Sequence, residues 1–199
     1  MLKEHIALGW RAWARNRSLG TLFAITAVCC ILIAFTSDIM ISLPPLLSWK
    51  GVEVSNAAVI PLLVVVVQGW CLSRRDPRAE LGSVRRIAYA DCLLSMTPAV
   101  LFAVLSWSAN LPLGMISTRN IIGLAGLTLL SHAIGIKKLS AIPAVTWVLA
   151  SLLLGRTESY TARWSWPIKD RTDALSAIMA GTLCLLGIFL SLARARRAM

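Results

Sequence analysis

The segment CLSRRDPRAELGSVRRIAYADCL, residues 71–93, places five arginines between two long apolar runs. The run before it ends in PLLVVVVQGWCL (61–72), and the run after it contains CLLSMTPAVLFAVLSW (92–107). A helix needs about 20 mainly apolar residues to cross the hydrocarbon core of a bilayer. Arginine and lysine collect in the cytoplasmic connections between such helices. The segment therefore predicts two membrane spans joined on the cytoplasmic side.

The composition of the whole chain agrees with a bilayer environment. Of the 199 residues, 57% are hydrophobic, and the mean hydropathy is +0.74. Soluble domains have about 45–50% apolar residues. The net charge of +11 comes from basic residues at the ends of apolar runs. Because no soluble segment interleaves basic with aromatic residues, the charge is typical of membrane topology and not of nucleic-acid binding.

Apolar runs of suitable length predict an all-α fold with six transmembrane helices within residues 21–193. The predicted spans are 21–43, 56–72, 87–107, 118–136, 139–154 and 172–193. Pro44 and Pro45 end the first span, and Ser55 or Asn56 caps the second. In the sixth span, Ala177 and Gly181 form a pair of small residues four apart, a spacing typical of close helix contacts.

The distribution of Lys and Arg predicts the orientation. With both termini in the cytoplasm, 14 basic residues lie inside and 6 lie outside. This asymmetry favours an even number of spans with the basic tail 194–199 on the cytoplasmic side. We therefore expect an integral protein of the bacterial plasma (inner) membrane.

Residues 1–20 predict an amphipathic helix that lies in the cytoplasmic interface. Apolar and aromatic side chains recur at helical spacing, and arginines occupy other faces. Such a helix buries its apolar face at the boundary of headgroups and acyl chains. The residues that define it are Trp10, Arg11, Trp13 and Arg15.

The outer segment GRTESYTARWSWPIKDRT, residues 155–172, mixes aromatic and charged residues between the fifth and sixth predicted spans. It could fold back into the outer leaflet or form a solvated loop, and the residues alone do not choose. Tryptophan is favoured at membrane interfaces. Five tryptophans fall near predicted interfaces: Trp49, Trp70, Trp107, Trp164 and Trp166.

Motifs for catalysis, metal binding and nucleotide binding are absent from the sequence. There is no GxxxxGK[ST], HExxH or GxSxG pattern, and the five cysteines form no CxxC pair. We therefore predict no catalytic residue, no metal and no cofactor. Asp38 and Asp91 lie near the ends of predicted spans, and no charged residue falls at a predicted midplane. This pattern argues against an ion-coupled transporter, which needs a titratable or oxygen-rich centre.

Residues 76–86 predict a short helix between the second and third spans. Asp76 provides the N-cap, and Pro77 suits the first helical position. Glu80 lies in the first turns, where the helix dipole stabilises a negative charge. One face is apolar and the other faces are basic; the residues are Leu81, Val84 and Ala88, then Arg78, Arg85 and Arg86. Such a helix could dock another protein or lie on anionic lipid headgroups.

The chain resembles the ABC-2 family, the membrane subunits of type V ABC exporters. The resemblance rests on the element order, on Arg15-Asn16-Arg17-Ser18 before the first span, and on Arg75 to Leu81 before the third. It implies a permease that pairs with a second permease, as a homo- or heterodimer, and with separate cytoplasmic ATPase subunits. It further implies that 76–86 is the coupling helix, braced by the N-terminal helix.

The same resemblance implies that residues 155–172 close an outer gate, with Trp164 and Trp166 as gate residues. The cargo would be a peptide, a lipid or a hydrophobic compound. Two other readings stay open from the residues. One is the substrate-capture subunit of an energy-coupling-factor importer, and the other is a membrane scaffold or immunity protein that binds lipid or a partner through its basic face.

Overall fold

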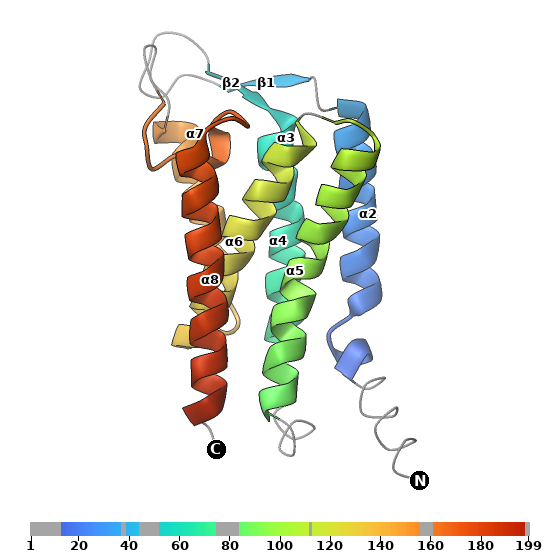
Figure 1. The fold of residues 1–199 in the computed structure, drawn as a ribbon, viewed down its shortest axis with the longest axis vertical. Helices are drawn as coiled ribbons and strands as arrows, with labels where there is room; N and C mark the ends of the chain where they lie inside the picture. The colour runs from blue at the N-terminus through green and yellow to red at the C-terminus, as the bar shows by residue number, and fades with distance from the viewer. Residues whose placement is uncertain are drawn as a thin grey trace.

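A computed structural model describes residues 13–36, 39–43, 52–74, 84–111, 113–155 and 161–197. Within these ranges the chain forms a bundle of helices that run alternately in opposite directions (Figure 1). The helices are α2 (Leu19–Thr36), α3 (Asn56–Val59), α4 (Pro61–Ser73), α5 (Val84–Ser108), α6 (Gly114–Ile134), α7 (Ile142–Leu154), the 3₁₀ helix η1 (Trp166–Ile168) and α8 (Ala174–Arg197).

Four helical stretches of the described chain are long and apolar enough to cross a membrane. They are Leu19–Thr36, Asn56–Ser73, Ile87–Ser108 and Ala174–Arg196. These stretches indicate a membrane protein. The predicted number of six spans is not confirmed: α6 has sufficient length but carries Arg119 and Asn120, and α7 has only 13 residues. At 1.5 Å per residue, α7 is about 20 Å long, short of the ~30 Å hydrocarbon core.

The bundle has two ends with different charge. We call the end where α2 begins and α8 terminates the basic end (Figure 1). The opposite end, where the two strands lie, is called the hairpin end. The basic end holds Arg15, Arg17, Arg74, Lys137, Lys138, Arg194 and Arg196; the hairpin end holds Glu53, Arg163, Lys169, Asp170, Arg171 and Asp173. Because the described chain begins and terminates at the same end, its ends agree with an even number of crossings.

A two-stranded antiparallel sheet at the hairpin end departs from the predicted all-α fold. Strand β1 (Met40–Leu43) pairs with β2 (Val52–Ser55), with Met40 opposite Ser55 and Leu43 opposite Val52. The first span was predicted to continue to residue 43, but α2 ends at Thr36. Extended residues on both sides of Pro44-Pro45 allow backbone pairing that a longer helix would prevent.

Local signals account for several helix ends. The Ser55 hydroxyl accepts a hydrogen bond from the Ala57 amide at 3.2 Å, which confirms the predicted cap of the second span. Gly135 follows α6 with φ +110°, a left-handed conformation that glycine adopts readily. The predicted basic tail begins inside α8, because that helix continues through Arg197.

Helices α4 and α6 form the centre of the bundle. One buried cluster joins α2, α4, α5 and α6 through Cys29, Ile33, Val64, Ala99, Phe102 and Ile121. A second joins α4, α6, α7, η1 and α8 through Val65, Leu124, Ala144, Val148, Trp166 and Ala180. A third, at the basic end, contains Leu22, Cys71 and Leu94. The outer helices α2 and α8 leave most of their apolar surface exposed, as expected for helices that face lipid.

Helices α6 and α8 approach closely at glycines that the sequence analysis did not select. A Cβ on Gly126 would lie 2.5 Å from the Cys184 nitrogen, and one on Gly187 would lie 2.4 Å from the Gly126 oxygen. The predicted contact pair fails, because a Cβ on Gly181 meets nothing within 4 Å and Ala177 is exposed. The close contact with α6 therefore lies on a different face of α8, the face that carries Cys184 and Gly187.

Candidate functional site

The residues predicted for the coupling helix and the interface helix fall largely outside the described ranges. Those outside are Trp10, Arg11, Asp76, Arg78, Glu80 and Leu81. Val84 and Arg85 are the first two residues of α5. Trp13 and Arg15 are described and belong to a helical stretch, 13–16, that ends before Ser18, whose φ is 51°. This short stretch does not test the amphipathic helix as a whole.

A buried ion pair at the basic end fastens the N-terminal stretch to α5. Arg17 donates from Nε to Asp91 Oδ1 at 3.0 Å and from Nη2 to Asp91 Oδ2 at 2.7 Å. The Trp13 indole nitrogen donates to the same Oδ1 at 3.3 Å. Arg17 is 1% exposed and Asp91 7% exposed. A bidentate, charge-assisted pair of this kind fixes both distance and orientation.

This ion pair corrects two sequence interpretations. The sequence predicted Asp91 near water at the end of a span, and it predicted Arg17 as a cytoplasmic basic residue before the first span without a partner. In the structure each neutralises the other inside the bundle. Ser18 has a left-handed backbone conformation that interrupts the helix between the 13–16 stretch and α2. The resulting turn lets Arg17 reach α5 at the basic end.

Arg74, at the end of α4, joins the same region. Its guanidinium donates to the Ser18 hydroxyl and lies 4.8 Å from the centre of the Trp70 ring. We call Trp13, Arg17, Ser18, Arg74 and Asp91 together the Arg17 junction. Through it, the N-terminal stretch contacts both α4 and α5, the two helices on either side of residues 75–83.

An open apolar groove lies beside the Arg17 junction. It has a volume of about 450 Å³. Its lining comes from the N-terminal stretch, α2 and α5: Trp13, Leu19, Phe23, Tyr89, Ala90, Leu93, Leu94 and Thr97. The groove has little polar lining, since the Trp13 indole and the Thr97 hydroxyl both donate within the protein. It can therefore accept an apolar chain.

At the hairpin end, the two predicted gate tryptophans have different environments. Trp166 is fully buried against α6 and α8, where a Cβ on Gly123 would lie 2.4 Å from its ring. Trp164 is 37% exposed and packs edge-to-face on Trp147, with ring centres 6.3 Å apart. Trp166 is thus a core residue, and its interpretation as an interface anchor is wrong.

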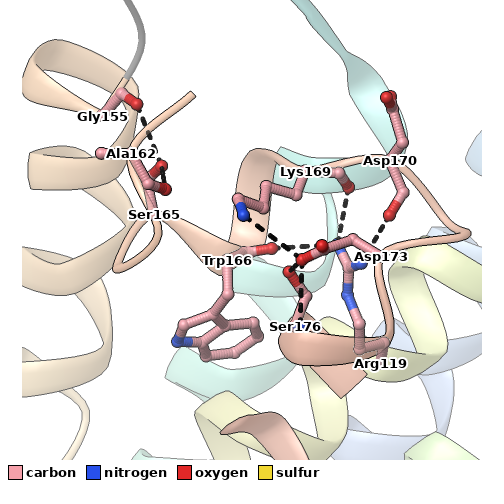
Figure 2. A network of polar contacts seen from close by, with 9 residues as sticks. All are labelled: Arg119, Gly155, Ala162, Ser165, Trp166, Lys169, Asp170, Asp173 and Ser176. Carbon is pink, nitrogen blue, oxygen red and sulfur yellow. Dashed lines mark hydrogen bonds and ion pairs between the residues drawn. The ribbon is translucent and has the colours of Figure 1, made fainter. Parts of the chain in front are cut away.

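Arg119 and Asn120 of α6 hold the segment that carries Trp166. Figure 2 shows the contacts of Arg119. Arg119 donates to the carbonyls of Asp170 at 2.8 Å, Trp166 at 3.0 Å and Lys169 at 2.8 Å. Asn120 donates to the Pro167 carbonyl at 2.8 Å and, at 3.4 Å, to that of Ala58. Arg119 is one of the six basic residues predicted to lie outside, and the sequence patterns did not select Asn120 as a functional residue.

Asp173 caps α8 next to this segment. Its carboxylate accepts from the Ser176 amide at 3.0 Å and from the Ser176 hydroxyl, and Lys169 lies 3.4 Å away. The Ser176 hydroxyl, the backbone amide and Lys169 hold the pKa of Asp173 below its ordinary 3.8. The cap is therefore charged at neutral pH.

Gln68 is a further buried polar residue that the sequence analysis overlooked. It lies on α4 one turn from Val64 and is fully buried, and neither amide atom has a hydrogen-bond partner among the described residues. A neutral amide in this position costs free energy unless it is bonded. Its position in an apolar run was the available sequence signal.

The described residues include no group of three or more His, Cys, Asp or Glu side chains that could hold a metal ion. Comparison of the chain with protein-family models, curated proteins and solved structures finds no match.

Proposed function

We propose that this chain is the membrane-spanning permease subunit of an ABC exporter in the bacterial inner membrane. The basic end would face the cytoplasm, where residues 76–86 would dock a separate ATPase. A second permease, identical or different, would complete the channel. The cargo would be a peptide, a lipid or a hydrophobic compound.

The Arg17 junction is the observation that carries the proposal. α5 begins within the proposed docking segment and runs to Ser108 near the hairpin end. Asp91 lies two turns into α5 and holds Arg17. A push on residues 76–86 would therefore move α5 and the N-terminal stretch together. A docking element needs such a rigid connection, whereas a simple topology loop does not.

The arrangement of the hairpin end favours an exporter over a substrate-capture subunit. Capture of a small polar metabolite from outside needs polar groups that are free to bind it. Arg119 and Asn120 instead donate to carbonyls of the chain's own backbone. Trp166 fills the space between α6 and α8. These contacts fill the hairpin end between α6 and α8, the end that would face outward in the proposed orientation.

Purification from native membranes tests the proposed partner. The tagged chain should bring down an ATPase subunit, and the double variant Arg78→Glu with Arg85→Glu should lose it. The matched control is Lys137→Glu with Lys138→Glu, two exposed cations at the same end of the bundle. The control should keep the ATPase.

If the Arg78 and Arg85 variant keeps both the ATPase and transport, the docking role of 76–86 is wrong. If the wild-type chain works without any ATPase in the cell, the scaffold reading replaces the exporter. Tight stoichiometric binding of a small metabolite by the lone chain would select the capture subunit.

A further inference from the structure

The groove beside the Arg17 junction is apolar along its length and open on one side. Its lining residues on α5 run from Tyr89 to Thr97, a rise of about 12 Å along the helix. Phe23 is 43% and Leu93 71% exposed. The two helices that supply most of the lining, α2 and α5, both qualify as membrane spans.

Two exposed arginines, Arg15 and Arg74, lie near the lining residues Trp13 and Leu19 along the chain or through a hydrogen bond, at the basic end of this groove. Arg15 is exposed and lies two residues after Trp13, which lines the groove. Arg74 is exposed and bonds Ser18, the neighbour of the lining residue Leu19. Asp91, the acidic residue nearest along α5, is already neutralised by Arg17. Among the described residues at this end of the groove, Arg15, Arg17 and Arg74 outnumber the one carboxylate, Asp91.

We propose that the groove binds one anionic phospholipid from the leaflet at the basic end. One acyl chain occupies the groove between α2 and α5, and the phosphate lies at Arg15 and Arg74. An apolar slot that ends in cations is complementary to an amphiphile with a negative headgroup. The bound lipid would tie the N-terminal stretch to α5 alongside the ion pair. This inference does not depend on the proposed transport function.

Native mass spectrometry of the detergent-purified chain tests the site. The probes are phosphatidylglycerol and phosphatidylcholine with identical acyl chains. We expect one phosphatidylglycerol to be retained in preference to phosphatidylcholine. Arg15→Gln and Arg74→Gln should each weaken its binding about fivefold, because one basic residue near an anionic lipid contributes about 1 kcal/mol. Thr97→Trp should abolish binding by filling the groove.

Matched controls place the changes elsewhere on the same surfaces. Lys137→Gln removes an exposed cation at the basic end away from the groove, and Val104→Trp enlarges an exposed residue of α5 outside it. Both should bind phosphatidylglycerol as the wild type does. Circular dichroism shows whether each variant is folded. If Thr97→Trp does not fold, the lipid retention of the two arginine variants tests the proposal.

Several outcomes would overturn the proposal. Equal retention of the two lipids would remove the role of charge, and equal loss in the controls would remove the role of this groove. Full competition by inorganic phosphate would show that the acyl chain contributes nothing. A second copy of the chain bound in place of lipid would make the groove a protein interface.

Discussion

Among the described residues, each end of the bundle contains one buried arginine, and the two are held in different ways. Arg17 at the basic end pairs with a carboxylate, Asp91, on another helix. Arg119 at the hairpin end donates to three backbone carbonyls of a single segment. In the first case both partners are side chains, so they can be exchanged or replaced together. In the second case the acceptors are backbone carbonyls, which a substitution does not remove. The basic end is therefore a connection between elements, and the hairpin end is a fixed closure.

Breaking the ion pair at one partner should have the largest effect. Asp91→Ala leaves a buried Arg17 charge without its carboxylate and should lower the free energy of unfolding by about 4 kcal/mol. Replacing both residues by Met should restore most of that loss, because no charge then stays buried. Chemical denaturation in micelles measures both variants. If the double variant is as unstable as Asp91→Ala, the ion pair is not the source of the loss.

Removal of Arg119 should cost less and should have no rescuing partner. Arg119→Met orphans up to three carbonyls and should lower the free energy of unfolding by about 3 kcal/mol. Arg119→Lys should recover only part of it, since a single ammonium does not reproduce the guanidinium geometry. Protease sensitivity of the 161–173 segment reports the local effect. A fully stable Arg119→Met variant would show that the closure does not need this residue.

Gly123 tests how tightly the hairpin end is packed. Gly123→Ala places a methyl group against the Trp166 ring and should destabilise the protein by about 2 kcal/mol. Gly181→Ala is the matched control on α8, because its added Cβ meets nothing within 4 Å. The thermal midpoint should fall for the first and rise slightly for the second, because alanine favours a helix more than glycine does. Equal shifts would mean that helix propensity, not packing, is measured.

The smallest effect concerns pH at the hairpin end. The pKa of Asp173 is lowered by the Ser176 hydroxyl, so its charged form is favoured in the folded protein. This contribution is present above its ordinary pKa of 3.8 and is lost as pH falls through the lower folded value. Asp173→Asn should flatten the acid limb of a stability profile measured between pH 5 and 2, by about 1 kcal/mol or less. An unchanged profile would contradict the cap.

Apolar runs and basic flanks predicted the positions of the main helices, because lipid exposure leaves a long continuous signal. The sheet was missed, although Val52-Glu53-Val54-Ser55 alternates apolar and polar residues as a strand does. That signal is only four residues long, and β1 continues an apolar run that also suits a helix. Periodicity alone does not distinguish such a short strand from the end of a longer apolar helix.

The buried contacts could not be predicted for a different reason. Arg17 and Asp91 are 74 residues apart, and a single sequence does not pair them. Arg119 binds backbone carbonyls, which every residue carries, so no partner residue marks the site. Trp166 was assigned to the interface by its type. Gly123, the glycine opposite it, leaves room for its ring inside the bundle.

The most direct test of the central claim measures whether the Arg17 junction transmits motion. The chain is reconstituted with the ATPase subunit that we propose as its partner, and ATP-driven transport is measured for Asp91→Asn, Arg17→Gln and the exchange Arg17→Asp with Asp91→Arg. We predict that the single variants bind the ATPase but lose most transport, and that the exchange regains a substantial part. Full transport by a folded Asp91→Asn variant would contradict the role of the junction.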